Sequence, residues 1–221
     1  MSHDELVKQR KATSYYDKFS GVYDVLSPKS YYHKARLQAI RELRINKGSS
    51  VLNVPVGTGQ NIEYLQKYLE NSGLIVGVDI SLGMLRKAKK KTEQNQWKNI
   101  KLLNRNVAEL GSSIGSEALG SEGLEGFDAI LCDLGLSGFP QWKDVIDALV
   151  SMLSKNGRIS IMDWYIENPS MRGNFVKWIG KGEVDRPIWQ YLETKVLDFR
   201  VDSSFNRGGV FVASGRKIDD S

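Results

Sequence analysis

The chain has 221 residues, a net charge of +5 and one cysteine, so its length suits a single α/β domain with a full core and does not require a second. The single cysteine, Cys132, lies in an apolar run, which excludes disulfides as a source of stability and fits a reducing compartment. The N-terminus has no apolar segment and no apolar run reaches a membrane-spanning length, so we expect an unprocessed, cytoplasmic protein.

Much of the basic excess lies in the segment Arg86–Lys91. Positive charge can attract anionic partners such as nucleic acid or a membrane surface. This run, however, forms the exposed face of a helix that we expect at 82–94, and its basic end suits the helix dipole. A solvated helix face is therefore the favoured interpretation, and peripheral membrane contact stays open.

Two helices are predicted before the first strand. Residues 14–26 carry aromatic side chains at helical spacing, and the helical pattern restarts over 30–44 after a proline. We therefore predict an N-terminal helical cap at 1–46 and one compact α/β unit at 47–221.

The unit at 47–221 opens with a strand, a glycine turn and a helix. The apolar run 51–56 ends at Gly57-Thr58-Gly59, and a helical pattern follows over 62–69. In a doubly wound sheet such a turn lies at the carboxyl end of the first strand, where the glycines let backbone amides approach a ligand.

A second apolar run ends at Asp79, where a carboxylate can accept both hydroxyls of a ribose. The glycine turn and this carboxylate together predict a nucleoside-binding site. The dinucleotide fingerprint needs a third glycine, and Ile62 stands at that position, so the pyrophosphate cradle is incomplete.

The remaining elements follow the same periodicities, separated by a glycine- and serine-rich surface excursion at 111–126. Asn156-Gly157 is predicted to stop a helix, and Asn206-Arg-Gly-Gly209 predicts a hairpin. The expected helices are 82–94, 142–153, 170–181 and 187–192, and the expected strands are 74–79, 100–104, 127–133, 158–164, 194–205 and 209–217.

The segment Val51-Leu-Asn-Val-Pro-Val-Gly-Thr-Gly59 resembles the first motif of the class I S-adenosylmethionine (SAM) methyltransferases, with Asn53 where that family usually has Asp. The pairs Tyr16-Asp17 and Tyr23-Asp24 are similar to the cap of the ubiquinone/menaquinone-biosynthesis and phospholipid N-methyltransferase branch. The resemblance implies a seven-stranded Rossmann-like sheet of order 3-2-1-4-5-7-6, with an antiparallel final hairpin.

The resemblance also implies SAM as the cofactor, S-adenosylhomocysteine as its product, and no metal. Proton removal is assigned by position to Asp133, His33 or Tyr16, with Asp163 as a further candidate. The cofactor-binding residues that it implies are Tyr16, Tyr23, Asn53, Pro55, Gly57, Thr58, Gly59, Asp79, Ile80, Met84, Asn106, Val107, Asp133 and Leu134.

The predicted function is methyl transfer from SAM to a small-molecule or lipid-like acceptor, a quinol, phenol or amine. A nucleic-acid base is disfavoured because Cys132-Asp133-Leu134-Gly135 replaces the Asp/Asn-Pro-Pro-Tyr signature of enzymes that methylate such amino groups. Three alternatives remain: a nicotinamide-dependent oxidoreductase, a SAM-binding module without turnover, and an RNA methyltransferase. The oligomeric state is not predicted.

Overall fold

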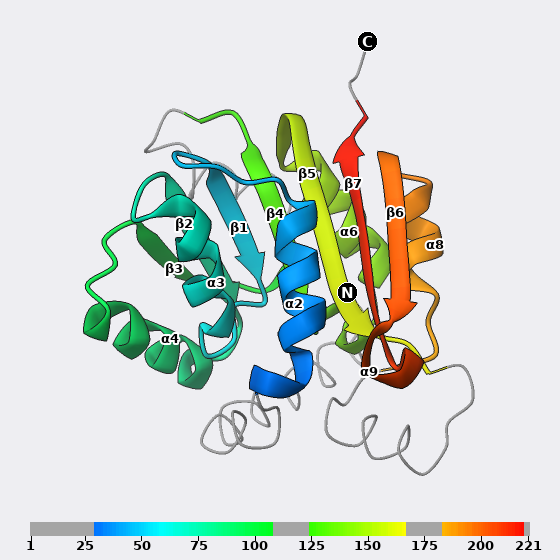
Figure 1. The fold of residues 1–221 in the computed structure, drawn as a ribbon, viewed down its shortest axis with the longest axis horizontal. Helices are drawn as coiled ribbons and strands as arrows, with labels where there is room; N and C mark the ends of the chain where they lie inside the picture. Colours follow the sequence, from blue (N-terminus) through cyan, green and yellow to red (C-terminus); the bar gives the residue numbers. More distant parts are fainter. Residues whose placement is uncertain (1–28, 108–123, 167–182, 219–221) are drawn as a thin grey trace.

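A computed structural model describes residues 29–107, 124–166 and 183–218, which form a seven-stranded sheet with helices on both faces (Figure 1). The strand order is β3-β2-β1-β4-β5-β7-β6, which confirms the predicted topology. The strands are β1 (Ser50–Val54), β2 (Leu74–Asp79), β3 (Ile100–Asn104), β4 (Phe127–Asp133), β5 (Leu153–Trp164), β6 (Val196–Ser204) and β7 (Val210–Lys217).

The first five strands are parallel and β7 is antiparallel to both β5 and β6. The central strand β1 is buried along its whole length, as expected where helices cover both faces of a parallel sheet. Because parallel strands run in one direction, the carboxyl ends of β1 to β5 all meet at one edge, which we call the carboxyl edge.

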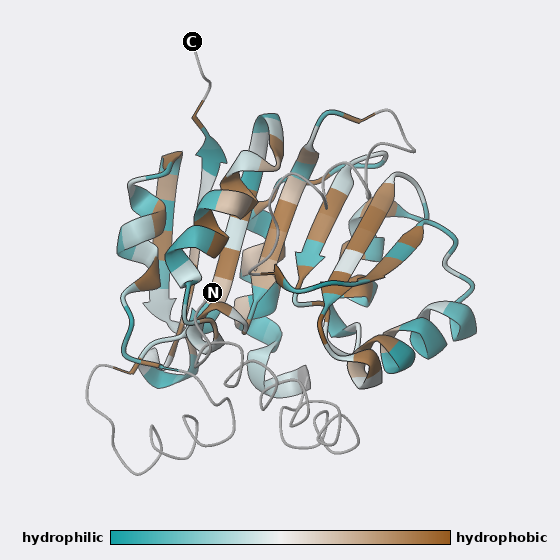
Figure 2. Ribbon diagram, turned by 180° about the vertical axis from the view of Figure 1, so that it is seen from behind, coloured by the Kyte–Doolittle hydropathy of each residue, from teal (hydrophilic) through white to brown (hydrophobic). Residues whose placement is uncertain are grey.

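Helices α2 (Lys29–Glu42) and α3 (Gln60–Leu69) cover one face of the sheet, in front in Figure 1. Their apolar residues pack on the side chains of β1, β2, β4 and β7 that face them. Helices α6 (Trp142–Ser151) and α8 (Ile188–Glu193) cover the opposite face (Figure 2), where the buried cluster includes Ile146, Ile188 and Phe211.

Helix α4 (Leu82–Gln94) has the predicted bounds, and its buried residues Met84, Leu85 and Ala88 lie three and four apart. Its outer face is hydrophilic (Figure 2), and Lys89 and Lys90 there are exposed. The Ser81 hydroxyl caps the helix by accepting a hydrogen bond from the Met84 amide at 3.2 Å.

The final hairpin follows the sequence signal. Between β6 and β7 lies α9 (Phe205–Gly208), a single turn in which Asn206 and Arg207 have φ of 53° and 60°. The Gly209 amide donates to the Asn206 carbonyl at 3.4 Å, so the central residues of this turn are Arg207 and Gly208, whose φ is 79°. Two left-handed central residues are the requirement of a type I′ turn, which joins antiparallel strands with the twist of the sheet.

The prediction that Asn156-Gly157 stops a helix is wrong. Helix α6 ends at Ser151, and β5 begins two residues later because buried Leu153 already pairs with Phe127 of β4. The left-handed Asn156 (φ 65°) and Gly157 lie inside this strand, where a Cβ on Gly157 would stand 2.7 Å from the Phe127 carbonyl oxygen. The two residues therefore fit an irregular pairing in the sheet.

Other predicted elements lie beyond the part of the chain that the structure describes. These are the aromatic helix at 14–26, the helix at 170–181 and nearly all of the 111–126 excursion. In the three described ranges, no helix has the length and apolar character needed to cross a membrane. The division of the chain at residue 46 stays a prediction.

Candidate functional site

The glycine turn lies at the carboxyl edge, between β1 and α3. Gly57 and Gly59 have φ of 55° and 78°, a region that favours glycine. A Cβ on Gly59 would lie 3.2 Å from Ala88 of α4, whereas a Cβ on Gly57 would meet nothing within 4 Å. Gly59 therefore serves close packing, and Gly57 presents open backbone.

The Asp79 carboxylate organises the same turn from the end of β2. Its Oδ2 accepts a hydrogen bond from the Gly57 amide at 2.8 Å, and its Oδ1 accepts one from the Ser81 amide at 2.9 Å. A carboxylate has further lone pairs beyond these two bonds. Asp79 can thus hold the turn and still accept a hydroxyl from a ligand.

The end of β3 supports Asp79 from the other side. The Asn104 amide donates to the backbone carbonyls of Asp79 and Ile80, at 3.0 and 2.9 Å. The two predicted adenine contacts follow β3 directly, Asn106 half-buried and Val107 buried. Sequence reasoning missed Asn104, whose only signal was an amide at the end of an apolar strand.

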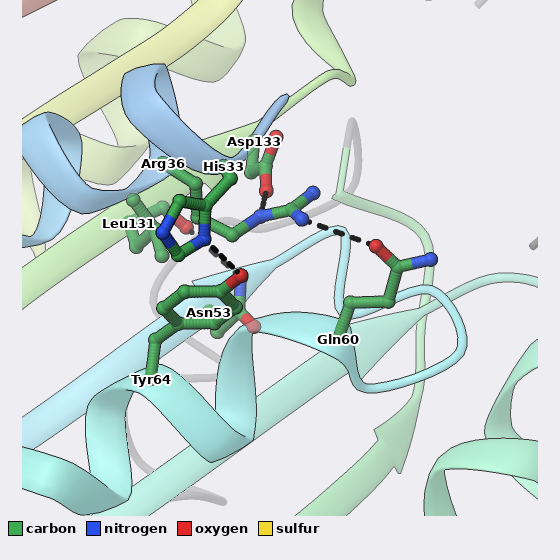
Figure 3. Close-up of polar contacts among 7 residues, drawn as sticks. All are labelled: His33, Arg36, Asn53, Gln60, Tyr64, Leu131 and Asp133. Carbon is green, nitrogen blue, oxygen red and sulfur yellow. Dashed lines mark hydrogen bonds and ion pairs between the residues drawn. The ribbon is translucent and has the colours of Figure 1, made fainter. Parts of the chain in front are cut away.

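A buried polar cluster joins α2 to the carboxyl ends of the strands (Figure 3), with Arg36 at its centre. The Arg36 Nε donates to Asp133 Oδ2 at 3.0 Å, and Nη1 donates to Gln60 Oε1 at 3.1 Å. The guanidinium carbon lies 5.9 Å from the ring centroids of both Tyr32 and Tyr64. Arg36 thus holds the end of β4 and the start of α3 together.

Arg36 was not predicted as a site residue, although the sequence contained a signal. It occupies an apolar-face position of α2, in register with Tyr32, Ala39 and Leu43, and only 4% of it is exposed. A cation on the buried face of a helix needs a buried partner. The pattern could therefore have indicated a buried ion pair, but not its partner Asp133, 97 residues away.

His33 points from the same helix toward α3. Its Nδ1 lies 2.9 Å from the hydroxyl of buried Tyr64, and the tautomer decides which of the two groups donates. The imidazole itself is exposed. The predicted catalytic candidates His33 and Asp133 therefore belong to one cluster, through Tyr64 and Arg36 (Figure 3).

Asn53, in the middle of the first motif, is fully buried on β1. It pairs with Leu131 of β4, and its Nδ2 donates to the Leu131 carbonyl at 3.4 Å. The structure therefore places Asn53 on β1, next to β4, the strand that ends at Asp133.

The loop after β4 is fixed by Asp163 at the end of β5. This carboxylate is fully buried and accepts hydrogen bonds from the amides of Ser137 and Trp164, at 3.0 and 2.7 Å. Burial raises the pKa of Asp163 from 3.8 to about 6, against the lowering effect of these hydrogen bonds. Because both of its oxygens accept hydrogen bonds from backbone amides, Asp163 positions the loop after β4.

Two further observations concern the same loop. The Ser137 carbonyl accepts a hydrogen bond from the Glu183 amide at 2.8 Å, which ties the loop to the segment before α8. A Cβ on Gly135 would overlap the Pro55 ring, so Pro55 abuts this loop.

Burial raises the pKa of the Cys132 thiol well above its usual value, and Asp163 and Asp133 raise it further, so Cys132 is a packing residue.

Aromatic rings form a group where α2 begins and β5 ends. Tyr31 stacks on Trp164 with centroids 6.1 Å apart, and Tyr32 meets the edge of the same indole at 5.7 Å. Tyr31 is 37% exposed, so this group reaches the surface at the carboxyl edge. We call Tyr31, Tyr32 and Trp164 the aromatic edge.

The described site residues of the sequence prediction therefore gather at one edge of the sheet. Thr58 and Met84 are buried there, and Ile80 and Leu134 are half-buried. Tyr16 and Tyr23 lie outside the described residues. Arg36, Gln60, Tyr64 and Ser137 were not predicted.

Comparisons with known proteins identify the family and the fold. The methyltransferase domain family matches residues 45–192. The demethylmenaquinone methyltransferase of Bacillus cereus is 27% identical over 169 residues, which cover 75% of this chain and 66% of that protein. The chain thus spans slightly under two thirds of that relative's length.

Two solved structures share the fold. The N-methyltransferase NodS of Bradyrhizobium japonicum, in complex with S-adenosylhomocysteine, superposes with a TM-score of 0.64 at 15% identity, over 86% of this chain and 88% of that one. Phosphoethanolamine N-methyltransferase 2 of Haemonchus contortus, in complex with SAM, gives a TM-score of 0.67 at 11% identity, over 84% of this chain and 53% of that one. The family match covers more than half of the sequence, and the chain therefore belongs to the methyltransferase domain family, whose class I members take SAM as their methyl donor.

Proposed function

We propose that the protein transfers the methyl group of SAM to a planar aromatic acceptor of the quinol type. The observation that carries this proposal is the aromatic edge, which lies at the same end of the sheet as the glycine turn and Asp133. Flat aromatic rings favour offset or edge-on contact with a planar ligand. The name of the Bacillus cereus relative, which refers to a quinone, points to the same acceptor class.

The residues at the carboxyl edge fit SAM as the donor. Open backbone at Gly57 leaves room for a ligand beside the turn, and Asp79 can accept ribose hydroxyls. The buried Asn53 and Asp133 each retain an acceptor oxygen for a donor group. In this proposal Asn106 and Val107 contact the adenine, and Ile80, Met84 and Leu134 line the rest of the cofactor site.

When bound, SAM supplies an activated methyl group and leaves as S-adenosylhomocysteine after in-line displacement at the methyl carbon. The chain then mainly has to hold donor and acceptor in line, which can lower the barrier by several kcal/mol. In the proposal, the aromatic edge orients the acceptor ring, and Asp163 fixes the neighbouring loop through Ser137.

A quinol acceptor must also lose a proton. Asp133 is bonded to Arg36 and Asp163 is fully enclosed, so neither is well placed to receive it. His33 is exposed and its ring is oriented by Tyr64. We therefore assign proton removal to His33, with its other nitrogen as the acceptor.

The proposal is tested by incubating the protein with SAM labelled in its methyl group and three acceptors: a reduced short-chain naphthoquinone, phosphoethanolamine and RNA. We expect label on the quinol alone. Label on RNA or on the amine alone would refute the acceptor class, and SAM binding without transfer to any acceptor would favour the binding module. The family match and the antiparallel β7 leave no support for the nicotinamide alternative.

A variant pair examines the aromatic edge itself. Trp164→Ala should raise the KM for the quinol about fivefold and leave SAM affinity unchanged, because an aromatic contact contributes roughly 1 kcal/mol beyond its buried area. Trp189→Ala is the matched control, since that indole packs against Tyr165 and Phe211 on the opposite face of the sheet. Equal effects of the two changes would contradict the role of the edge.

A further inference from the structure

Among the buried side-chain atoms that have no hydrogen-bond partner within the described ranges are two oxygens near the carboxyl ends of β1 and β4. They are Oδ1 of Asn53, which is 0% exposed, and Oδ1 of Asp133, which is 6% exposed. Buried polar atoms are rarely left without a partner, because desolvation without a replacement bond costs free energy. Each of these oxygens therefore needs a donor that this part of the chain does not supply.

The sheet brings the two side chains to the same face. Asn53 is directly opposite Leu131 in the register of β1 and β4, and Asp133 lies two residues beyond Leu131. Because side chains two apart on a strand point to one face, Asn53 and Asp133 both face α2 and α3. Figure 3 shows them on either side of the Arg36 side chain.

The bonds already made fix what each residue can offer. The Asn53 Nδ2 donates to the Leu131 carbonyl, so its Oδ1 is the remaining group and can only accept. The Asp133 Oδ2 accepts from Arg36, which leaves Oδ1 as the second oxygen of a carboxylate. Two acceptors, one of them carrying charge, suit a cationic donor with several N–H bonds, such as an ammonium group.

We infer that Asp133 supplies the negative charge for the ammonium of the methionyl part of SAM, and that Asn53 contributes a neutral acceptor beside it. The methionyl part is a zwitterion, and Arg36 adds a positive group adjacent to Asp133 for its carboxylate. The carboxylate at the end of β4 thus performs the task that the amide at position 53 cannot perform. The inference rests on SAM as the ligand and is independent of the acceptor.

Calorimetric titration without any acceptor tests it with three ligands. SAM has both the ammonium and the carboxylate, decarboxylated SAM keeps the ammonium alone, and methylthioadenosine lacks both. Asp133→Asn should weaken SAM and decarboxylated SAM about 10- to 100-fold, the range for a hydrogen bond to a charged group, and should leave methylthioadenosine unchanged. Asp128→Asn, a matched change at the other end of β4, should alter none of the three.

A second variant moves the charge back to β1. Asn53→Asp combined with Asp133→Asn should recover most of the lost affinity for decarboxylated SAM. Asn53→Asp alone places two carboxylates side by side and should not tighten binding. If Asp133→Asn does not fold, Arg36→Gln with Asp133→Asn removes both charges of the pair, and decarboxylated SAM still reports on the ammonium contact alone.

The possible results are distinct. Equal losses for all three ligands would mean that Asp133 only supports the fold of the site, and unchanged affinities would remove it from the cofactor site. Either result overturns the inference. A loss confined to SAM, with decarboxylated SAM unaffected, would also overturn it, because the carboxylate and not the ammonium would then be the group recognised.

Discussion

Asp163 predicts a specific pH dependence of stability. Burial raises the pKa of this carboxyl from 3.8 to about 6 in the folded protein, whereas the unfolded chain keeps the ordinary value. Each pKa unit corresponds to about 1.36 kcal/mol, so the difference amounts to about 3 kcal/mol. At pH values between 3.8 and about 6 the folded state binds more protons than the unfolded state. The free energy of unfolding therefore falls as pH rises through this range.

Stability falls with rising pH because the folded state favours the protonated form of Asp163. The contribution of Asp163 to stability is fully present below pH about 4, is lost as pH rises through about 6, and is constant above that. Asp163→Asn cannot titrate, so its free energy of unfolding should lack this component. The substitution also replaces one acceptor oxygen with an NH2 donor that faces the Ser137 or Trp164 amide, which is itself a donor. The loss of that hydrogen bond lowers the stability of the variant at every pH.

Urea unfolding at intervals from pH 4 to pH 8 measures the difference. We expect the gap in unfolding free energy between wild type and Asp163→Asn to narrow by up to about 3 kcal/mol across this range. Asp144→Asn, at an exposed carboxyl in the first turn of α6, should give a gap that does not change in this way. Parallel curves for wild type and Asp163→Asn would refute the reasoning.

Four further substitutions have expected outcomes. Arg36→Met should lower the free energy of unfolding, measured in urea, by about 3 to 5 kcal/mol, because it leaves the buried carboxylate of Asp133 without its counter-ion. A loss below about 1 kcal/mol would contradict a stabilising role for this ion pair. Gly59→Ala should destabilise by about 2 kcal/mol and Gly57→Ala by about 1 kcal/mol, since both lose left-handed freedom but only the first meets neighbouring atoms; equal melting temperatures would contradict this difference. His33→Asn should lower kcat by about 10²-fold or more with unchanged SAM affinity, and an unaltered kcat in a methyl-transfer assay would exclude proton removal by this imidazole.

Local signals predicted most of the fold. The apolar runs, the glycine turn and Asn206-Arg207 each act within a few residues, and the structure places β1, β2, α4 and the final hairpin accordingly. The same local reasoning was wrong at Asn156, because a left-handed residue with a following glycine suits an irregular strand as well as a helix end. Pairing of Leu153 with Phe127, a contact between distant segments, decides between the two.

The site was predicted less completely because its polar contacts join distant parts of the chain. Asp79 and Gly57 of the glycine turn are 22 residues apart and form a recognisable motif, so a shared site was predicted, although the bond from the Gly57 amide to Asp79 was not. Arg36 and Asp133 meet only because α2 packs on the face of the sheet where β4 ends. No spacing in the sequence indicates such a contact before the sheet order and the position of α2 are known.

Most buried polar groups of the described residues lie at the carboxyl edge, although Arg158 and Ser160 on β5 also bury atoms without a partner in those ranges. Elsewhere the two faces of the sheet bury mainly aliphatic and aromatic side chains. At the carboxyl edge the protein buries Asp163 with a raised pKa, and Oδ1 of Asn53 and Oδ1 of Asp133 lack partners in the described ranges. Each arrangement lowers stability, and apolar residues could have filled the same positions. Such local costs are expected where a fold maintains a binding site, because a ligand that completes these bonds recovers the free energy only when it is bound.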